Sequence, residues 1–235
     1  MKKGKRIGRT VLIGLAALLA AGAAAFYIYT ADYYRADESA LRAPETGAVR
    51  LSQTDYGWFF DGPADAAALI FYPGALVEET AYAPLLCRLA ENGLDVCLVK
   101  MPFHLAVLDA DAADGVMARY DYARWYIGGH SLGGAMAANY AADHALDGVI
   151  LLAAYPTRAV DEPMLLLYGE KDGVLDRDRV AGAGRFGSVE EIVIPGGNHA
   201  GFGNYGAQKG DGAADIPAAE QQTITAEAVE AWLAG

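Results

Sequence analysis

A serine between glycines is the residue of this sequence whose surroundings most clearly suggest chemistry. Residues 129–133 read Gly-His-Ser-Leu-Gly, a G-x-S-x-G motif, between a strand-like apolar run and a helix-like pattern. The turn is so sharp that a Cβ at either flanking position would clash, and it would hold the Ser131 hydroxyl exposed above a sheet. The following helix points its N-terminus at this position, which favours developing negative charge. The motif predicts Ser131 as a nucleophile.

A nucleophilic serine needs a general base, and the sequence offers four histidines. His104 and His130 precede the serine, and His130, its neighbour in the turn, would point elsewhere. His144 lies along the following helix, which would carry it about 18 Å away at 1.5 Å per residue. His199 remains, on the glycine-rich stretch "IPGGNHAGFGNYG" after the last predicted strand. We therefore expect His199 to be the base.

A carboxylate must orient that base, and the stretch "MLLLYGEKDGVL" supplies a candidate between the serine and the histidine. Asp172 lies in a turn just past a predicted strand, whereas Glu170 competes for the role at the same strand end. Asp176 and Asp178 lie farther along and are typical of a helix start. The spacing favours Asp172.

The polar stretch "NYGAQKGDGAADI" after His199 has two alternative interpretations. We expect the loop amides and Asn204 or Gln208 to brace the histidine. Asp211 is the second candidate for the triad acid, although it would break the usual chain order of serine, acid and histidine. The spacing of the acids matches no Ca²⁺ cage.

An oxyanion hole is the last part that such a catalyst needs. One donor should be the backbone N–H of Leu132, directly after the nucleophile, and the other should come from the loop "FYPGALVEE". Pro73 has no N–H, so Gly74 or Ala75 must donate. We expect Ala75 to donate, with Gly74 letting the backbone approach. An ordinary Pro-Gly turn is the alternative interpretation.

These residues must be positioned by the elements between residues 48 and 235, where short apolar runs alternate with helical patterns. Strands that are apolar throughout and separated by helices predict a doubly wound, mostly parallel sheet covered on both faces. In such a sheet the chemistry lies at the carboxyl ends of the strands. The predicted strands are 67–74, 94–102, 124–131, 147–156, 163–172 and 189–197; the predicted helices are 79–93, 132–145 and 225–234, with a weakly helical stretch at 111–121 and an antiparallel pair within 49–60 at the edge.

The first thirty residues predict a membrane anchor. Five basic residues precede residues 11–29, which carry no charge and would span about 28 Å as a helix. The basic side stays in the cytoplasm, so a single-pass protein with an extracytoplasmic catalytic domain is expected. A signal peptide cleaved before Phe26, giving a secreted protein, is the alternative. A linker over 31–47 and one domain over 48–235 would follow.

The charge of the chain argues against nucleic-acid binding, and its two cysteines raise the question of a disulfide. The formal net charge is −12, and residues 1–30 contribute +5, which leaves −17 for the rest. So acidic a domain is a poor binder of nucleic acid. Cys87 lies five residues before the turn at Asn92, along a helix, and Cys97 five residues after it, along a strand. Their Cα atoms would then lie farther apart than the roughly 7 Å that a disulfide allows, so we expect two buried free thiols. No cofactor and no metal site are expected.

These features together resemble the α/β-hydrolase superfamily. The stretches "FYPGALVEETAYAPL", "VKMPFHLAVLD", "GGHSLGGAMAA" and "GGNHAGFGNYGAQKGDG" are similar to the small bacterial α/β-hydrolase fold-5 group, close in scale to dienelactone hydrolase. The resemblance implies an α/β-hydrolase fold and hydrolysis through an acyl-enzyme. The chain departs from dienelactone hydrolase itself, which has a cysteine at the position of Ser131. It also has Pro73-Gly74 where many esterases carry a His-Gly pair.

A short connection sets the expected access to the site. Only "YPTRAVDEP" joins the strand after the nucleophile helix to the strand before the acid, too short for a lid domain. We expect an open site for bulky or polymer-attached acyl groups, with Phe103 and His104 lining it or, alternatively, packed on the core edge. The expected function is a serine hydrolase of esters or thioesters. The alternatives are a non-catalytic, membrane-tethered binding or scaffold protein and a serine peptidase.

Overall fold

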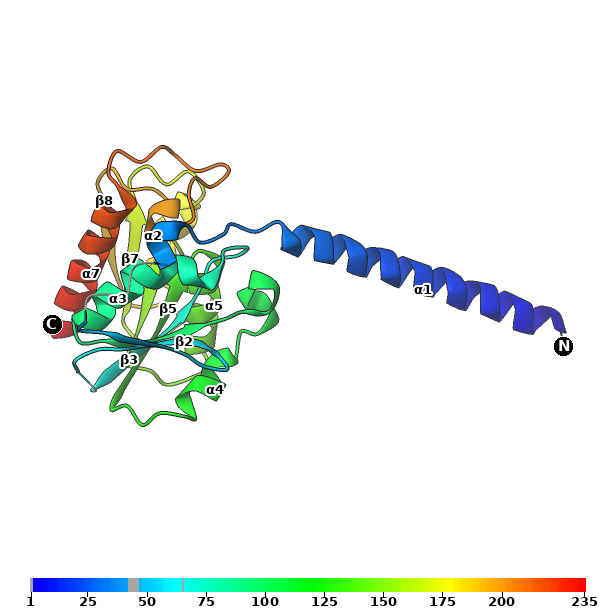
Figure 1. The fold of residues 1–235 in the computed structure, drawn as a ribbon, viewed down its shortest axis with the longest axis horizontal. Helices are drawn as coiled ribbons and strands as arrows, with labels where there is room; N and C mark the ends of the chain where they lie inside the picture. The colour runs from blue at the N-terminus through cyan, green and yellow to red at the C-terminus, as the bar shows by residue number, and fades with distance from the viewer. Residues whose placement is uncertain (1, 42–46, 65) are drawn as a thin grey trace. The chain divides into compact units, whose positions relative to one another are not determined.

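The computed structural model describes residues 2–41, 47–64 and 66–235, with only the backbone described for 2–10 and 41. The chain divides into two compact units, Met1–Tyr33 and Tyr34–Gly235. The first unit is essentially one helix, α1 (Lys2–Ala31) (Figure 1). Its stretch Val11–Ala31 is long and apolar enough to cross a membrane, a property that signal sequences share.

The second unit is built on one eight-stranded sheet, as the alternation of apolar runs predicts. The strand order is β1-β2-β4-β3-β5-β6-β7-β8. All neighbours from β4 to β8 run parallel, and β2 is antiparallel to both β1 and β4, which confirms the edge pair. The strands are β1 (Arg50–Gln53), β2 (Gly57–Asp61), β3 (Ala67–Tyr72), β4 (Asp95–Val99), β5 (Arg124–His130), β6 (Gly148–Leu152), β7 (Met164–Gly169) and β8 (Val189–Ile194).

Helices cover both faces of this sheet. Leu69 and Phe71 of β3 point into the core under α3 (Ala83–Glu91) and α7 (Ala218–Ala234), which pack against each other (Figure 1). Ile70 and Tyr72 of the same strand point into the opposite core, under the remaining helices. Because successive side chains of a strand alternate between faces, a strand apolar at every position needs both covers. These other helices are α4 (Ala112–Met117), α5 (Leu132–Ala141) and α6 (Arg177–Ala181).

Several element boundaries differ from those predicted. The first predicted helix divides into a 3₁₀ turn, η1 (Glu79–Tyr82), and α3, because Pro84 opens a new first turn. The closing helix begins at Ala218, seven residues before the predicted start, since the two buried glutamines that follow carry no apolar signal. Further 3₁₀ turns are η2 (Pro102–His104), η3 (Ala106–Leu108), η4 (Ala183–Arg185) and η5 (Ala200–Phe202).

The segment predicted as a linker over 31–47 is partly an ordered component of the second unit. Tyr34 forms a parallel bridge with Val77, on the loop after β3. The N–H of Asp37 donates to the carbonyl of Asn204, on the loop after β8. α2 (Glu38–Leu41) then packs beside η1 and α3. We call residues 34–41 the strap; the part of the predicted linker at 42–46 lies outside the described residues.

Candidate active site

Ser131 occupies a strained turn between β5 and α5. Its backbone lies at φ 53° and ψ −124°, an uncommon conformation for a residue with a side chain. Its N–H donates to the carbonyl of Leu152 at 2.9 Å, which ties the turn to β6. A Cβ on Gly129 would lie 2.4 Å from the Tyr72 carbonyl oxygen, and one on Gly133 only 2.2 Å from it. The flanking glycines are therefore required for close approach, as the sequence predicts.

His199 and Asp172 form a buried pair beside this turn. The Nδ1 of His199 lies 2.9 Å from Oδ2 of Asp172, and the two side chains are 2% and 0% exposed. The other oxygen, Oδ1, accepts the N–H groups of Val174 and Leu175, both at 2.8 Å. Burial by itself raises the pKa of Asp172. The hydrogen bond to His199, the electrostatic effect of His199 and the two backbone amides outweigh burial, so the net pKa is lowered.

The pair leaves the other ring nitrogen of the histidine available. An ionised carboxylate only accepts hydrogen bonds, so Nδ1 of His199 carries a proton, and Nε2 is the ring nitrogen that remains for another partner. Nε2 is buried and has no hydrogen-bond partner within the described part of the chain. His199 and Ser131 line the same cavity, of about 380 Å³. The hydrogen bond between Ser131 and this nitrogen is not formed here, a frequent state of catalytic pairs without substrate.

Asp211, the second candidate for the acid, is used differently in this structure. Its Oδ1 accepts the N–H of His199 at 3.1 Å and that of Gly173 at 3.1 Å, and its Oδ2 accepts the N–H of Ala200 at 2.9 Å. It therefore fixes the backbone of the histidine loop to the turn that carries Asp172. The sequence feature that could have predicted this role is an acidic residue in a glycine-rich loop, where backbone N–H groups need acceptors.

The two side chains predicted to brace His199 lie one step further away. Asn204 donates to Ser39 of the strap and accepts from Gln222 of α7. Gln208 accepts the hydroxyl of Tyr205. Both stabilise the loop that follows the histidine, whereas Asp211 contacts the backbone of the histidine itself.

The two predicted oxyanion donors come from α5 and from the loop after β3. Leu132 begins α5, so its N–H has no acceptor within that helix. On the loop after β3, the N–H of Gly74 donates to the hydroxyl of Tyr82 at 3.1 Å and is thereby occupied. A Cβ on Gly74 would lie 2.7 Å from Nδ1 of His130 and 2.8 Å from the Tyr82 hydroxyl. A glycine at position 74 therefore lets the backbone lie close to His130 and Tyr82. Ala75, the next residue, stays the predicted second donor.

Phe103 and His104 lie on the loop after β4, beside the loop after β3. Both have positive φ, of 53° and 57°, and the His104 carbonyl accepts the N–H of Leu76 at 2.9 Å. Burial lowers the pKa of His104, whose Nδ1 lies 4.0 Å from a carboxylate oxygen of Glu79. Phe103 is 52% exposed. Neither lines the cavity shared by Ser131 and His199, so their contact with substrate stays a prediction.

Comparison with known proteins places this geometry in a family. Residues 68–223 match the model of the alpha/beta hydrolase family. The chain belongs to the alpha/beta hydrolase family. No curated protein sequence matches this hydrolase.

Solved structures share the fold of this alpha/beta hydrolase at low sequence identity. A dienelactone hydrolase from Anabaena variabilis is 15% identical with a TM-score of 0.57, covering 79% of this chain and 97% of its own. Esterase 2 of Thermogutta terrifontis, solved phosphoramylated by tabun, is 15% identical with a TM-score of 0.56, covering 81% and 96%. Est1E from Butyrivibrio proteoclasticus is 14% identical with a TM-score of 0.58, covering 80% and 100%.

The walls of the cavity at Ser131 come from three segments, none of whose residues the sequence predicts to line a substrate site. All three follow the carboxyl ends of central strands, which is the signal that could have found them. Besides Ser131 and His199, the lining residues are Leu132, Ala135 and Met136 of α5, Ala153, Ala154, Tyr155 and Thr157 after β6, and Val174, Leu175 and Asp176 after β7. The walls are mainly apolar, with one carboxylate at Asp176.

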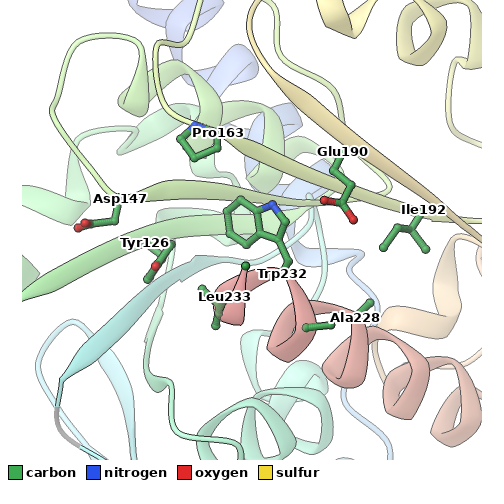
Figure 2. Close-up of a pocket in the computed structure, with 10 residues that line it drawn as sticks. Tyr126, Asp147, Pro163, Glu190, Ile192, Ala228, Trp232 and Leu233 are labelled. Atoms are coloured by element: carbon green, nitrogen blue, oxygen red, sulfur yellow. The ribbon is translucent and has the colours of Figure 1, made fainter.

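A second cavity of the hydrolase lies near the amino ends of β5, β6 and β7, beside α7, and contains none of the three predicted catalytic residues. Its volume is about 470 Å³. Trp232 of α7 lies between the carboxylates of Asp147 and Glu190, with Tyr126 at the amino end of β5 nearby (Figure 2). In the described part of the chain, no group of three or more potential metal ligands is found.

Proposed function

We propose that this protein is a serine hydrolase that cleaves carboxylic esters or thioesters through an acyl-enzyme. The observation that carries the proposal is the buried His199–Asp172 pair at 2.9 Å, whose free Nε2 belongs to a ring that lines the same cavity as Ser131. In the proposed reaction, Nε2 takes the proton of the serine hydroxyl as its oxygen attacks the substrate carbonyl. The lowered pKa of Asp172 keeps its carboxylate ionised, so that it stabilises the imidazolium that forms.

Two backbone amides would receive the negative charge of the tetrahedral intermediate. We assign them to Leu132, at the N-terminus of α5, and to Ala75. Gly74 is the weaker candidate, because its N–H already donates to Tyr82. His199 then returns its proton to the leaving alcohol or thiol, and the same histidine activates the water that hydrolyses the acyl-enzyme.

An open site is the second part of the proposal. The connection between β6 and β7 covers residues 153–163 and contains no helix or strand. With no lid domain at this position, bulky or polymer-attached acyl groups would reach the serine. The apolar cavity walls favour an uncharged acyl portion.

The proposed place of action follows from the first unit. We propose that α1 anchors the chain in a membrane with its basic end in the cytoplasm, so that the catalytic unit is extracytoplasmic. Removal of the helix by signal cleavage would give a secreted form of the same enzyme.

A fluorophosphonate probe tests the reaction type. Such phosphorus reagents modify a serine oxygen that a base activates, and the Thermogutta esterase was itself solved after modification by an organophosphorus compound. We expect labelling of the full chain at Ser131 by peptide mapping at pH 7 to 8, and loss of labelling in Ser131→Ala and His199→Ala. A folded protein that takes up no probe would instead favour the binding or scaffold function.

Substitution of the two carboxylates near the histidine separates the acid from its alternative. We expect Asp172→Asn to lower the labelling rate by about 10³-fold to 10⁴-fold, as loss of the orienting carboxylate does in serine proteases. Asp211→Asn should have a smaller effect, because this residue contacts the backbone of the loop. The opposite order would assign the acid to Asp211. Hydrolysis of peptides faster than of esters would select the serine peptidase.

A further inference from the structure

A buried chain of hydrogen bonds links the oxyanion loop to the histidine loop beneath the serine. The N–H of Gly74 donates to the hydroxyl of Tyr82 at 3.1 Å, and this hydroxyl lies 2.8 Å from Nδ1 of His130. The Nε2 of His130 lies 3.1 Å from the backbone carbonyl of His199. Tyr82 is 0% and His130 1% exposed. The triad uses neither of these two side chains.

For a neutral His130, the donors and acceptors along these hydrogen bonds can be assigned in only one consistent way. The Tyr82 oxygen accepts from Gly74, so the hydroxyl hydrogen is available for Nδ1 of His130. The carbonyl of His199 can only accept, so Nε2 of His130 must carry the proton. A neutral His130 therefore carries its proton at Nε2 and accepts at Nδ1. Burial, followed by the charge of His199, lowers its pKa well below the usual value, which agrees with this state.

Close packing around these hydrogen-bonded groups leaves little room for the distances between them to change. The ring centroids of His130 and His199 are 4.6 Å apart, and Phe202 packs against His130 from the same loop at 5.7 Å. On the other side, a single added carbon on Gly74 would lie within 2.8 Å of both His130 and Tyr82. A close-packed interior of this kind transmits displacements between the groups it joins.

We propose that Tyr82 and His130 are positioning residues that set the distance between the oxyanion donor and the catalytic base. This inference rests on the proposed serine hydrolase function. The loop after β3 carries the donor and the loop after β8 carries the base, so the sequence leaves their separation open. Groups that act in one transition state must be held within about 0.5 Å of their productive geometry. Tyr82 also engages the N–H of Gly74, which leaves Ala75 to face the oxyanion.

The assignment of donors and acceptors along these hydrogen bonds can be tested without any activity measurement. NMR of the full chain with ¹⁵N-labelled histidine should show His130 neutral and protonated at Nε2 from pH 6 to 8. In Tyr82→Phe, the Nδ1 signal should shift as its hydrogen-bond donor is lost. A His130 protonated at Nδ1, or charged in this range, would overturn the proposed bridge.

The kinetic test compares two buried tyrosines whose hydroxyl groups each accept one hydrogen bond and donate one. The hydroxyl of Tyr72 accepts the N–H of Ala113 and donates to the carbonyl of Ala110, both at 2.9 Å, and this residue is also fully buried. Tyr82→Phe should lower kcat toward a p-nitrophenyl ester by about tenfold with KM nearly unchanged, because small misplacements slow the chemical step. Tyr72→Phe should lower the melting temperature similarly but leave kcat within about twofold.

A pair of substitutions at the histidine covers the case in which Tyr82→Phe does not fold. His130→Gln retains a donor that can reach the His199 carbonyl, whereas His130→Phe retains only the ring. We expect kcat to fall in the order wild type, Gln, Phe. Equal kcat for all three, or an unchanged kcat in Tyr82→Phe, would overturn the inference alone. A wild-type protein that is not labelled at Ser131 would overturn the proposed function and the inference together.

Discussion

At the residue scale, Asp172 shows how this fold keeps a buried carboxylate ionised. Each oxygen has a partner: the ring of His199 on one, and the amides of Val174 and Leu175 on the other. Burial alone would favour the protonated form, yet the net effect of these partners is a lowered pKa. An ionised group held in this way contributes to folding stability as well as to the proposed chemistry.

The contribution of Asp172 to stability should depend on pH. Its folded-state pKa lies below the unfolded value of about 3.9, so the stabilisation is complete above that pH. It is lost as the pH falls from about 4 through the folded-state pKa. The difference in unfolding free energy between wild type and Asp172→Asn should therefore be largest near pH 7 and shrink toward pH 3. Chemical denaturation of the full chain in detergent, at a series of pH values, measures it.

An exposed carboxylate provides the control for this series. Asp121 lies on a loop before β5 and is exposed. Asp121→Asn should change stability little at any pH. If the Asp172 difference were the same at pH 3 and pH 7, its carboxylate would not be stabilised by the contacts described.

At the element scale, the N-terminus of α5 is pressed against the end of β3. A Cβ on Gly133 would lie 2.2 Å from the carbonyl oxygen of Tyr72 and 2.3 Å from that of Pro73. These oxygens belong to the backbone at the end of β3 and at the start of the following loop, so they cannot rotate away as a side chain could. The close approach brings the helix N-terminus to the site where negative charge would develop.

Alanine in place of two helical glycines should give opposite results. Gly133→Ala forces α5 away from β3 and should cost at least about 2 kcal/mol of stability while also slowing labelling of Ser131. A Cβ on Gly115 of α4 would have no neighbour within 4 Å, so Gly115→Ala should gain about 0.5–1 kcal/mol from helix propensity. Denaturation curves and labelling rates compare them. Equal stability of the two variants would contradict the close approach at Gly133.

The strap shows a different relation between element and site. Tyr34 exchanges backbone hydrogen bonds with Leu76 and Glu78 on the loop after β3, and its hydroxyl accepts the N–H of Lys209 on the loop after His199. Its ring packs 5.6 Å from that of Tyr205. The strap thus fastens the same two loops from the outside that Tyr82 and His130 join from the inside.

At the scale of the whole molecule, the charge distribution separates the two units. Residues 1–30 are basic and contain no acid, whereas the remainder is strongly acidic. The side chains of Val11–Ala31 are largely exposed, which gives this helix a long apolar surface. Such a surface is stable in a bilayer rather than in water.

The full chain should therefore behave as an integral membrane protein. We expect it in the membrane fraction after alkaline carbonate washing, with an intact N-terminus by sequencing. A reporter fused after Gly235 should be active only when it functions outside the cytoplasm. Recovery of a mature chain that starts near Phe26 in the soluble fraction would replace the anchor by a cleaved signal peptide.

Most of the fold follows from local patterns of the sequence. The central strands β3, β4, β6 and β7 are apolar at nearly every position because each is buried on both faces, so their parallel arrangement can be inferred without contacts. The motif at Ser131 can also be recognised in the sequence, although the carbonyls of Tyr72 and Pro73 that leave Gly133 no room for a side chain belong to a distant part of the chain. The start of α7 and the strap were missed, since buried glutamines and a polar segment give no apolar period.

What the sequence alone determined is the set of local elements and the order of serine, acid and histidine along them. Only the tertiary structure decided which side chains meet. It brings Asp172 rather than Asp211 to the ring of His199, and it occupies the Gly74 amide with Tyr82. Local patterns depend on neighbours in the chain, whereas these contacts join residues on different loops. Their distances exist only once the strands have aligned and both faces of the sheet are packed.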